Sequence, residues 1–274
     1  MSQSPAGRPL GHVASLWRFP VKSMAGEPLP SAFLGYAGVY GDRVYAFHSS
    51  TAHPRFPYLT AREREAMLLC RPAFLHPDRM AAPPNLAEAE AAPPGLTPVY
   101  ATPDDAALEV QLPTGERLPI DDPALAAWLG EGGRDGQVLR LLHSHHAMTD
   151  CRPVSLLSAQ TARQVGDESG LAVDPLRFRA NIVLDLHDES GADAPGFSED
   201  ALVGRTLRLG ERATVAILDR DPRCKMIALD PATAALDGAI LKCVGQQHEG
   251  RAGIYAAVLA EGTVRPGDPV TCLD

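Results

Sequence analysis

One cysteine of the chain lies directly between two cations. Residues 219–231 have the sequence DRDPRCKMIALDP, in which Arg223 and Lys225 flank Cys224. Neighbouring cations favour the thiolate over the thiol, and the thiolate is the form that binds metals or attacks electrophiles. The Asp-Pro pair ahead of the cysteine indicates a turn, so we expect Cys224 at the end of a strand and outside the core. The other interpretation is a buried structural cysteine beside two surface cations.

Three further segments carry polar side chains that could surround a phosphate and a polar heterocycle. They are residues 18–26 (RFPVKSMAG, with Lys22 and Ser23), 149–155 (TDCRPVS, with Asp150 and Arg152) and 177–181 (RFRAN, with Arg177, Arg179 and Asn181). The two-residue period of a strand would place the three polar residues of the last segment on one side. Each segment alone is typical of a solvated strand end. Together they offer the lysine, arginine, serine and asparagine donors that bind phosphates and heterocycle edges.

A histidine run, His143-Ser144-His145-His146, suggests a metal site, because imidazole is a common ligand of zinc, nickel and copper. Residues two apart share one face of a strand, but no third ligand of matching spacing lies nearby in the sequence. We therefore favour a solvated strand end for this run. The sequence has no H-E-x-x-H, Walker A or G-x-S-x-G motif and no G-x-G-x-x-G after a strand. The usual signatures of zinc proteases, P-loop enzymes, serine hydrolases and Rossmann dehydrogenases are therefore missing.

The composition limits the class of protein. The 274 residues include 25 lysines and arginines against 34 aspartates and glutamates, a net charge of −9. This balance argues against a general nucleic-acid or anionic-membrane binder, so a basic pocket would be a local construction. No stretch reaches the roughly 18 consecutive apolar residues of a membrane span, and the start lacks the apolar core of a secretory signal. We expect a cytoplasmic protein. Five cysteines without C-x-x-C spacing give little support for a disulfide framework or a four-cysteine zinc site.

Strand patterns outnumber helix patterns, and 24 glycines with 25 prolines favour turns and short strands. We expect strands at 12–19, 43–48, 106–112, 116–120, 138–142, 181–185, 206–209, 213–219, 253–260 and 269–273. We expect helices at 60–69, 122–130, 155–165 and 237–245, and an exposed connection over the Ala-, Pro- and Glu-rich residues 81–98. A mixed α/β, strand-rich fold built on β-barrels fits this pattern better than a regular alternation of strand and helix.

The polar, glycine-rich residues 130–136 (GEGGRDG) are the best candidate for a domain boundary. We expect a disordered tail at 1–9, an N-terminal β-barrel domain at 10–130 and a second barrel domain at 137–274. A cofactor cleft is expected between the two parts, because Lys22 and Arg43 belong to the first and Cys224 to the second.

The order of five motifs, FPVKSMAG, RPVSLLS, RFRANIV, DPRCKMIALDP and GDPV, resembles that of the MOSC superfamily over nearly the whole chain. The early FPVKS resembles the N-terminal β-barrel domain that precedes MOSC domains. The resemblance implies that N-terminal domain followed by a MOSC β-barrel domain. It also implies a molybdenum-cofactor protein similar to the bacterial relatives of the mitochondrial amidoxime-reducing component.

In such proteins a cysteine thiolate binds molybdenum beside the two dithiolene sulfurs of molybdopterin, and Cys224 falls in the matching motif. The resemblance implies contacts to the pterin phosphate or its surroundings at Lys22, Ser23 and Arg43. It implies further cofactor contacts at Arg179, Asn181, Arg223, Thr149, Asp150 and Cys151. Pyridoxal phosphate binding is a further association of the family. A soft thiolate suits a high-valent molybdenum centre, and local cations suit a phosphate.

The chain departs from the family pattern in two respects. Ala180 stands before Asn181 where relatives often have the proline of R-x-R-P-N, and we expect this to alter backbone stiffness and not ligation. The chain ends at Asp274 and has no ferredoxin-like cysteine spacing, so the iron–sulfur domain fused to some relatives is expected to be missing. Electrons would then come from a separate donor protein of the iron–sulfur or haem type. No membrane anchor of the mitochondrial kind is expected.

Three hypotheses for the function follow. The leading hypothesis is an oxidoreductase in which molybdenum bound to Cys224 reduces small N-hydroxylated or N-oxygenated compounds by oxygen-atom transfer. The second is a non-catalytic carrier that holds the molybdenum cofactor or delivers sulfur from a persulfide on Cys224. The third is a cysteine-nucleophile enzyme with a histidine base. It is the weakest, because no histidine lies near Cys224 in the sequence.

Overall fold

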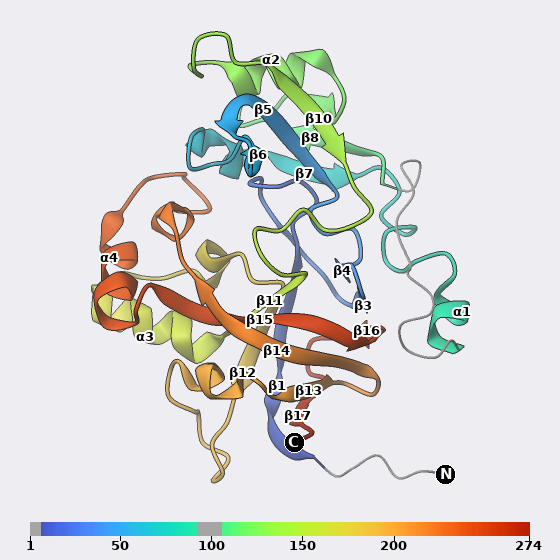
Figure 1. Cartoon of the computed structure of the whole chain (residues 1–274), viewed down its shortest axis with the longest axis vertical. Coiled ribbons are helices and arrows are strands. Elements are labelled where there is room, and N and C mark those ends of the chain that lie inside the picture. Colours follow the sequence, from blue (N-terminus) through green and yellow to red (C-terminus); the bar gives the residue numbers. More distant parts are fainter. Residues whose placement is uncertain (1–6, 92–105) are drawn as a thin grey trace.

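The computed structural model describes residues 7–91 and 106–274 of the chain (Figure 1). Its strands are β1 (Arg8–Arg18), β2 (Glu27–Pro28), β3 (Ala32–Gly35), β4 (Gly38–Val39), β5 (Tyr45–His53), β6 (Phe56–Tyr58), β7 (Arg71–Phe74), β8 (Leu108–Gln111), β9 (Arg117–Pro119), β10 (Leu139–His143), β11 (Val154–Ser158), β12 (Ile182–Leu186), β13 (Thr206–Leu209), β14 (Ala213–Pro222), β15 (Arg251–Ala260), β16 (Gly262–Val264) and β17 (Pro269–Cys272). The α-helices are α1 (Leu86–Ala91), α2 (Pro123–Gly130), α3 (Ala159–Ser169) and α4 (Gly238–Gln247). The 3-10 helices are η1 (Glu65–Leu69), η2 (Pro175–Phe178), η3 (Ser198–Leu202) and η4 (Lys225–Ala228).

Seven strands of the described chain close into a barrel in the order β12, β11, β15, β14, β13, β17 and β1. The ring closes because β1 pairs with β12 on one side and with β17 on the other. Apolar side chains fill the interior, among them Val13, Leu16, Leu156, Ile182, Leu184, Val215, Ile254 and Val270. The expectation of a strand-rich mixed α/β fold that contains a β-barrel is confirmed.

The N-terminal part is rich in short strands and lies against one end of this barrel (Figure 1). Three small sheets of the described residues have the orders β10-β5-β6, β7-β8-β9 and β16-β3-β4. A second apolar core joins them, with Phe33, Phe47, Met67, Met80, Leu108 and Leu125 among its buried members. Among the described residues, no helix is long and apolar enough to cross a membrane.

The two halves of the sequence share strands. β1 belongs to the first half but completes the barrel of the second, and β3 pairs with β16. The glycine-rich stretch at 130–136 therefore separates two halves of the sequence, but these halves share sheets in the structure. Residues 1–6 of the expected tail lie outside the described residues. β1 already begins at Arg8, because Arg8 pairs with Cys272 of β17 and extends the barrel edge.

Three expected elements differ in the structure. In place of the helix expected at 60–69, the structure has a turn followed by η1. In the turn, the backbone N–H groups of Glu63 and Arg64 both donate to the Thr60 carbonyl. The helix expected at 155–165 is strand β11 followed by α3, because residues 154–158 pair with β12 and β15 inside the barrel. Ser158 caps this helix, and Gly170 ends it with a left-handed φ of 71°.

The third difference lies at 177–181, where a strand was expected. Asp174 caps the short helix η2, and Arg179 then adopts a left-handed conformation with φ 54° before β12 begins. Of the Ala-, Pro- and Glu-rich connection, residues 86–91 form α1, and residues 92–98 lie outside the described part. The helix expected at 122–130 is confirmed as α2, with Asp122 as its cap and Pro123 in its first turn.

A third apolar cluster holds the elements that carry the candidate site. Helices α3 and α4 pack beside η2 and η4 on one flank of the barrel (Figure 1). The cluster comprises Leu157, Ala162, Val165, Phe178, Ala180, Ile227, Ile240, Val244 and Ala252. Because Phe178 and Ile227 belong to it, their neighbours Arg179 and Cys224 are placed by packed elements and not by free loops.

Candidate functional site

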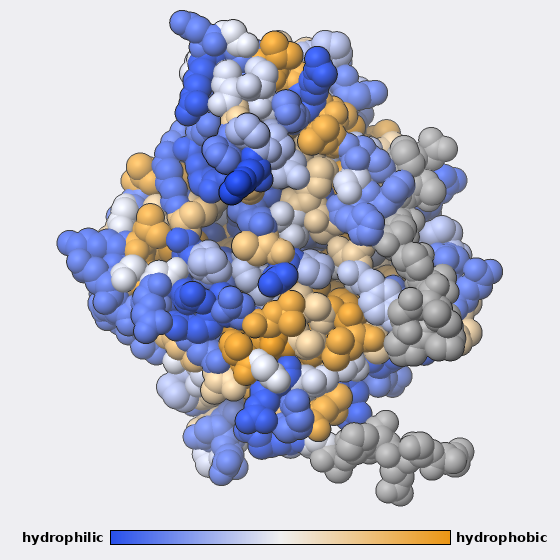
Figure 2. All heavy atoms as spheres, viewed as in Figure 1, coloured by the Kyte–Doolittle hydropathy of each residue, from blue (hydrophilic) through white to orange (hydrophobic). Residues whose placement is uncertain are grey.

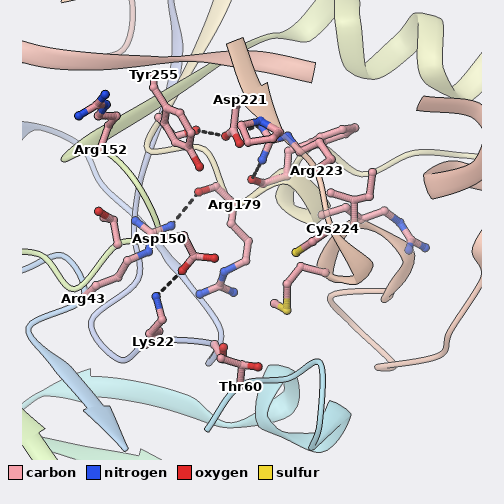
Figure 3. A pocket seen from close by; sticks show the side chains of 18 of the residues that line it. Lys22, Arg43, Thr60, Asp150, Arg152, Arg179, Asp221, Arg223, Cys224 and Tyr255 are labelled. Carbon is pink, nitrogen blue, oxygen red and sulfur yellow. Dashed lines mark hydrogen bonds and ion pairs between the residues drawn. The ribbon is translucent and has the colours of Figure 1, made fainter. Parts of the chain in front are cut away.

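A cleft lies where the N-terminal sheets meet the barrel (Figure 3). Its volume is about 730 Å³, including the part open to solvent. Nine of the ten residues that the sequence implicated line it, namely Lys22, Ser23, Arg43, Thr149, Asp150, Arg179, Asn181, Arg223 and Cys224. The structure thus brings Lys22 and Arg43 of the first half to the same cleft as Cys224.

The tenth residue, Cys151, is exposed and does not line the cleft. Its neighbour Asp150 pairs with Lys22, and Cys151 itself lies near Tyr255, which does line the cleft. Cofactor contact at Cys151 therefore stays a prediction from the family resemblance.

Lys22 and Asp150 form an ion pair on the floor of the cleft. Lys22 is only 4% exposed, and its Nζ also donates to the Met148 carbonyl at 2.8 Å. Burial lowers the pKa of Lys22, Asp150 counteracts this, and the charges of Arg43 and Arg179 lower it further. Burial raises the pKa of Asp150, but the neighbouring cations, Lys22 first, outweigh it, so the net pKa of Asp150 is lowered. The Lys22–Asp150 pair therefore lies among further positive charges.

Arg43 and Arg179 supply most of these charges. Both adopt left-handed backbone conformations, with φ 47° and 54°, and both guanidinium groups lie over the Phe19 ring, 4.8 and 4.2 Å from its centroid. Arg179 donates through Nη1 to the Met24 carbonyl at 2.8 Å. Its Nη2 is buried and has no hydrogen-bond partner among the described residues. Burial and then the charge of Arg43 lower the pKa of Arg179 to about 9, although the carboxylates of Asp42 and Asp150 counteract this shift.

Asn181 joins three strands behind the arginines. It is 1% exposed, its Nδ2 donates to the Trp17 carbonyl at 3.3 Å, and its Oδ1 accepts from the Ser155 N–H at 3.3 Å. These contacts connect β12 with β1 and β11. Asn181 therefore shapes the cleft wall by holding the backbone in place.

A buried polar network that the sequence did not reveal faces Cys224 from the barrel side (Figure 3). Asp221 is 2% exposed, accepts from Ser155 Oγ at 3.0 Å and pairs with Arg223 at 2.8 Å. Tyr255 also hydrogen-bonds to Asp221. Burial raises the pKa of both Asp221 and Tyr255, and the charge of Arg223 counteracts this shift at both groups. The only sequence signal for Asp221 is its place in the DPRC motif.

Cys224 lies at the beginning of η4 and is half-buried. The two cations that flank it in the sequence, Arg223 and Lys225, contact other groups. Arg223 donates to the carbonyls of Ala252 at 2.7 Å and Phe178 at 2.8 Å. Lys225 pairs with Glu65 of η1 at 2.6 Å. Both cations beside Cys224 are therefore engaged with other groups, and the accessibility of Cys224 distinguishes it from the buried cysteines.

Cys70 shows the contrast, because burial raises the pKa of its thiol to about 12. Burial also raises the pKa of Cys243, and Glu168 adds to this shift. Neither thiol forms a thiolate readily near neutral pH. Of the two cysteines that are not buried, only Cys224 lines the cleft.

The histidine run lies apart from this chemistry. His143 ends β10 and packs against the Tyr45 ring at 4.9 Å, and burial, followed by the nearby His145, lowers its pKa. Within residues 7–91 and 106–274, the groups of side chains that are spaced for a metal ion do not include the run.

The sequence did not single out several other residues that line the cleft. Thr60, Arg62, Met226 and Tyr255 also line it, and Arg152 and Arg177 join it from the segments that the sequence singled out. The cleft thus combines an accessible thiol, arginines with several buried donors that have no hydrogen-bond partner among the described residues, the exposed carboxylate of Asp150 and the buried carboxylate of Asp221. Such an arrangement can bind a soft metal and an anionic group in one ligand.

Comparison with protein families identifies the chain. Residues 10–121 match the MOSC N-terminal beta barrel domain, and residues 143–271 match the MOSC domain. The two matches cover most of the chain, and the seven-stranded barrel falls mainly in the second. The chain belongs to the MOSC family. The family matches give no support for pyridoxal phosphate binding.

Among solved structures, the chain has some similarity to the YuaD protein of Bacillus subtilis, with 12% identity, coverage of 95% of this chain and 94% of that chain, and a TM-score of 0.45. YiiM from Geobacillus stearothermophilus has 17% identity over 45% of this chain and 55% of that chain, with a TM-score of 0.32. YiiM from Escherichia coli has 19% identity, the same coverages and a TM-score of 0.31. No protein of curated function matches the chain.

Proposed function

We propose that this protein is a molybdenum-cofactor oxidoreductase that reduces small N-hydroxylated or N-oxygenated compounds. The observation that carries the proposal is the presence of an accessible thiol, Cys224, and an unpaired buried cation, Arg179, in one cleft. Membership of the MOSC family and the resemblance to bacterial relatives of the mitochondrial amidoxime-reducing component support it.

The residues of the cleft fit molybdopterin in three respects. The unpaired Nη2 of Arg179 suits the phosphate group, which a planar guanidinium binds well. The carboxylates of Asp150 and Asp221 can accept hydrogen bonds from the N–H edges of the pterin. The sulfur of Cys224 is a soft donor and suits molybdenum better than an oxygen ligand would.

When bound, the cofactor would supply oxygen-atom transfer between metal and substrate, which no amino-acid side chain performs alone. The residues of this chain would bind and orient it. Lys22, Arg43 and Arg179 would hold the anionic group, and Asn181 would keep the strands beneath them in register. Tyr255, which hydrogen-bonds to Asp221, would keep a proton close to the cleft.

The reduction needs two electrons that the described residues do not carry, so we propose a separate donor protein of the iron–sulfur or haem type. Substrate and electrons would reach Cys224 through the part of the cleft that is open to solvent. The alternative function is a non-catalytic carrier of the cofactor, or of sulfur as a persulfide on Cys224. The half-buried position of Cys224 is compatible with both functions.

The test is expression in cells that synthesise molybdopterin, followed by molybdenum and pterin analysis per chain. Reduction of a simple amidoxime with a chemical electron donor is then measured per bound molybdenum. We expect about one molybdenum per chain and turnover in the wild type, and loss of turnover in Cys224→Ser. Cys243→Ser is the matched control, because Cys243 does not line the cleft and is no predicted cofactor contact.

Each outcome decides between the hypotheses. Bound cofactor without turnover would favour the carrier, and a protein without molybdenum or pterin under these conditions would contradict both. Wild-type turnover per metal in Cys224→Ser would show that the thiolate is not the ligand.

A further inference from the structure

We propose that His12, Asp185 and His187 form a binding site for a divalent transition-metal ion of the Zn²⁺ type. One donor atom from each residue lies within 4.8 Å of the others. The site lies four residues along β12 from Asn181, about 13 Å from the cleft at about 3.3 Å per residue. It is therefore separate from the proposed cofactor site.

The barrel itself places these three side chains together. His12 of β1 is the direct cross-strand partner of Asp185 in β12. His187 follows two residues after Asp185, and side chains two apart in an extended segment lie on the same face. The pairing of β1 with β12 thus directs two imidazoles and one carboxylate toward a single space. Paired strands fix such positions more firmly than loops would.

The separation of the donors fits an ion better than a hydrogen bond. His12 Nε2 and Asp185 Oδ2 are 3.7 Å apart, which is beyond hydrogen-bond range. Two ligand bonds of about 2.0 to 2.2 Å at a tetrahedral zinc place their donor atoms roughly 3.4 Å apart. The rings of His12 and His187 lie nearly parallel, at an angle of 27° with centroids 5.7 Å apart. The three donors therefore surround a space of the right size.

Outer hydrogen bonds already hold two of the three ligands. Nδ1 of His187 lies 3.3 Å from the Gly191 carbonyl, which leaves Nε2 for a metal. Oδ1 of Asp185 accepts from Nε2 of the buried Gln160 at 2.7 Å, which leaves Oδ2. Gln160 is itself fixed by a hydrogen bond to the Leu186 carbonyl at 2.8 Å. Metal ligands in proteins characteristically have such partners, which set the tautomer and the orientation.

Gly11 allows the strands to meet this closely. Its φ is 141°, and a Cβ atom there would lie 1.9 Å from the Asp185 carbonyl oxygen and 3.0 Å from Cδ2 of His187. A larger residue would push β1 away from both ligands.

A second cluster, formed by Glu168, Cys243 and His248, is less suitable. Nε2 of His248 lies 2.5 Å from Oε2 of Glu168, which is the distance of a short hydrogen bond. A metal ion would have to force these two atoms apart. The geometry therefore favours the barrel site.

Two histidines and one carboxylate would supply two neutral nitrogen ligands and one oxygen ligand. Zinc accepts such a set of ligands, with water in the fourth position. The side chains of His12 and Asp185 are 42% and 31% exposed, so an ion can enter directly from solvent. A bound ion would connect β1 to β12 and to the turn that contains Gly191. It would thus stabilise the closure of the barrel.

The test is titration of Zn²⁺ into the full chain, purified without a histidine tag and treated with a chelator, by calorimetry. We expect one Zn²⁺ per chain and a higher melting temperature in its presence. His12→Ala and Asp185→Asn should each weaken binding at least about tenfold. Asp185→Asn keeps the side-chain shape, and circular dichroism will show whether both variants are folded. His145→Ala and Cys243→Ser are the matched controls and should bind as the wild type does.

Substitution with Co²⁺ distinguishes the two clusters. The site of His12, Asp185 and His187 should give visible bands without a thiolate-to-cobalt charge-transfer band, whereas a site with Cys243 should show one. A charge-transfer band that disappears in Cys243→Ser would overturn the proposal. Wild-type affinity in both His12→Ala and Asp185→Asn would overturn it, and so would failure of the wild type to bind Zn²⁺ at millimolar concentration.

Discussion

Arg43 donates through Nη2 to the backbone carbonyl of Arg179 at 2.9 Å, so two arginines from distant parts of the sequence share one cleft. Each holds a left-handed backbone conformation, which is uncommon for a residue with a side chain. The Phe19 ring beneath both guanidinium groups favours their charge through its π face. The remaining donor of Arg179 is still unpaired, and this leaves a place for an anion.

Replacement of Arg179 by methionine should separate anion binding from stability. Because burial and the charge of Arg43 make the Arg179 cation unfavourable, the free energy of unfolding should change by no more than about 1 kcal/mol. Binding of inorganic pyrophosphate should weaken about tenfold or more, since a charge-assisted contact is lost. Calorimetry and urea unfolding measure the two effects. Exposed Arg163→Met is the control, and a large loss of stability in Arg179→Met would instead indicate a packing role.

The pH dependence of stability should reveal the buried Lys22. Its pKa is lower in the folded protein than its ordinary value near 10.4, chiefly through burial. A base with a lowered folded pKa opposes folding while it is charged, and this cost disappears as the pH rises through the folded pKa toward the ordinary value. The wild type should therefore gain stability relative to Lys22→Met between neutral pH and about 10. Urea unfolding of both proteins across this range measures the difference, and a constant difference would contradict the burial argument.

The sequence allowed most of the cleft to be predicted because its residues lie in short, ordered motifs. Lys22, Arg179 and Cys224 each follow or precede a strand, and strand ends gather at the same face of a barrel. The structure shows that these three residues lie around one cleft, although the strand expected around Arg179 was wrong. A 3-10 helix replaces the expected strand there, because Asp174 and Pro175 begin a helix that tertiary contacts end after one turn.

The partners of the cations could not be predicted from the sequence. Lys225 pairs with Glu65, 160 residues away, so its effect on Cys224 depends on the folded topology. Arg223 likewise pairs with Asp221 and two backbone carbonyls. The helix expected at 155–165 failed for a similar reason, since pairing within the barrel overrides a local helix pattern.

Thiol alkylation should rank the cysteines by environment. At mildly alkaline pH, iodoacetamide should modify Cys224 and Cys151 first, because both are accessible. Cys70 should react far more slowly, since burial raises the pKa of its thiol to about 12. Pyrophosphate bound at Arg179 should protect Cys224 and leave Cys151 unchanged. Peptide mass spectrometry over time measures each rate, and equal protection of both cysteines would argue against a ligand in the cleft.

Replacement of Asn181 by alanine should destabilise the protein even without a cofactor. The side chain is 1% exposed and bonds the Trp17 carbonyl and the Ser155 N–H, so alanine would leave both buried groups unpaired. Each unpaired group costs about 1 to 3 kcal/mol. The free energy of unfolding should therefore fall by at least about 2 kcal/mol, measured by urea unfolding of the cofactor-free protein. Exposed Gln246→Ala provides the comparison, and a loss below about 0.5 kcal/mol, the range of ordinary surface substitutions, would show that Asn181 does not hold these strands together.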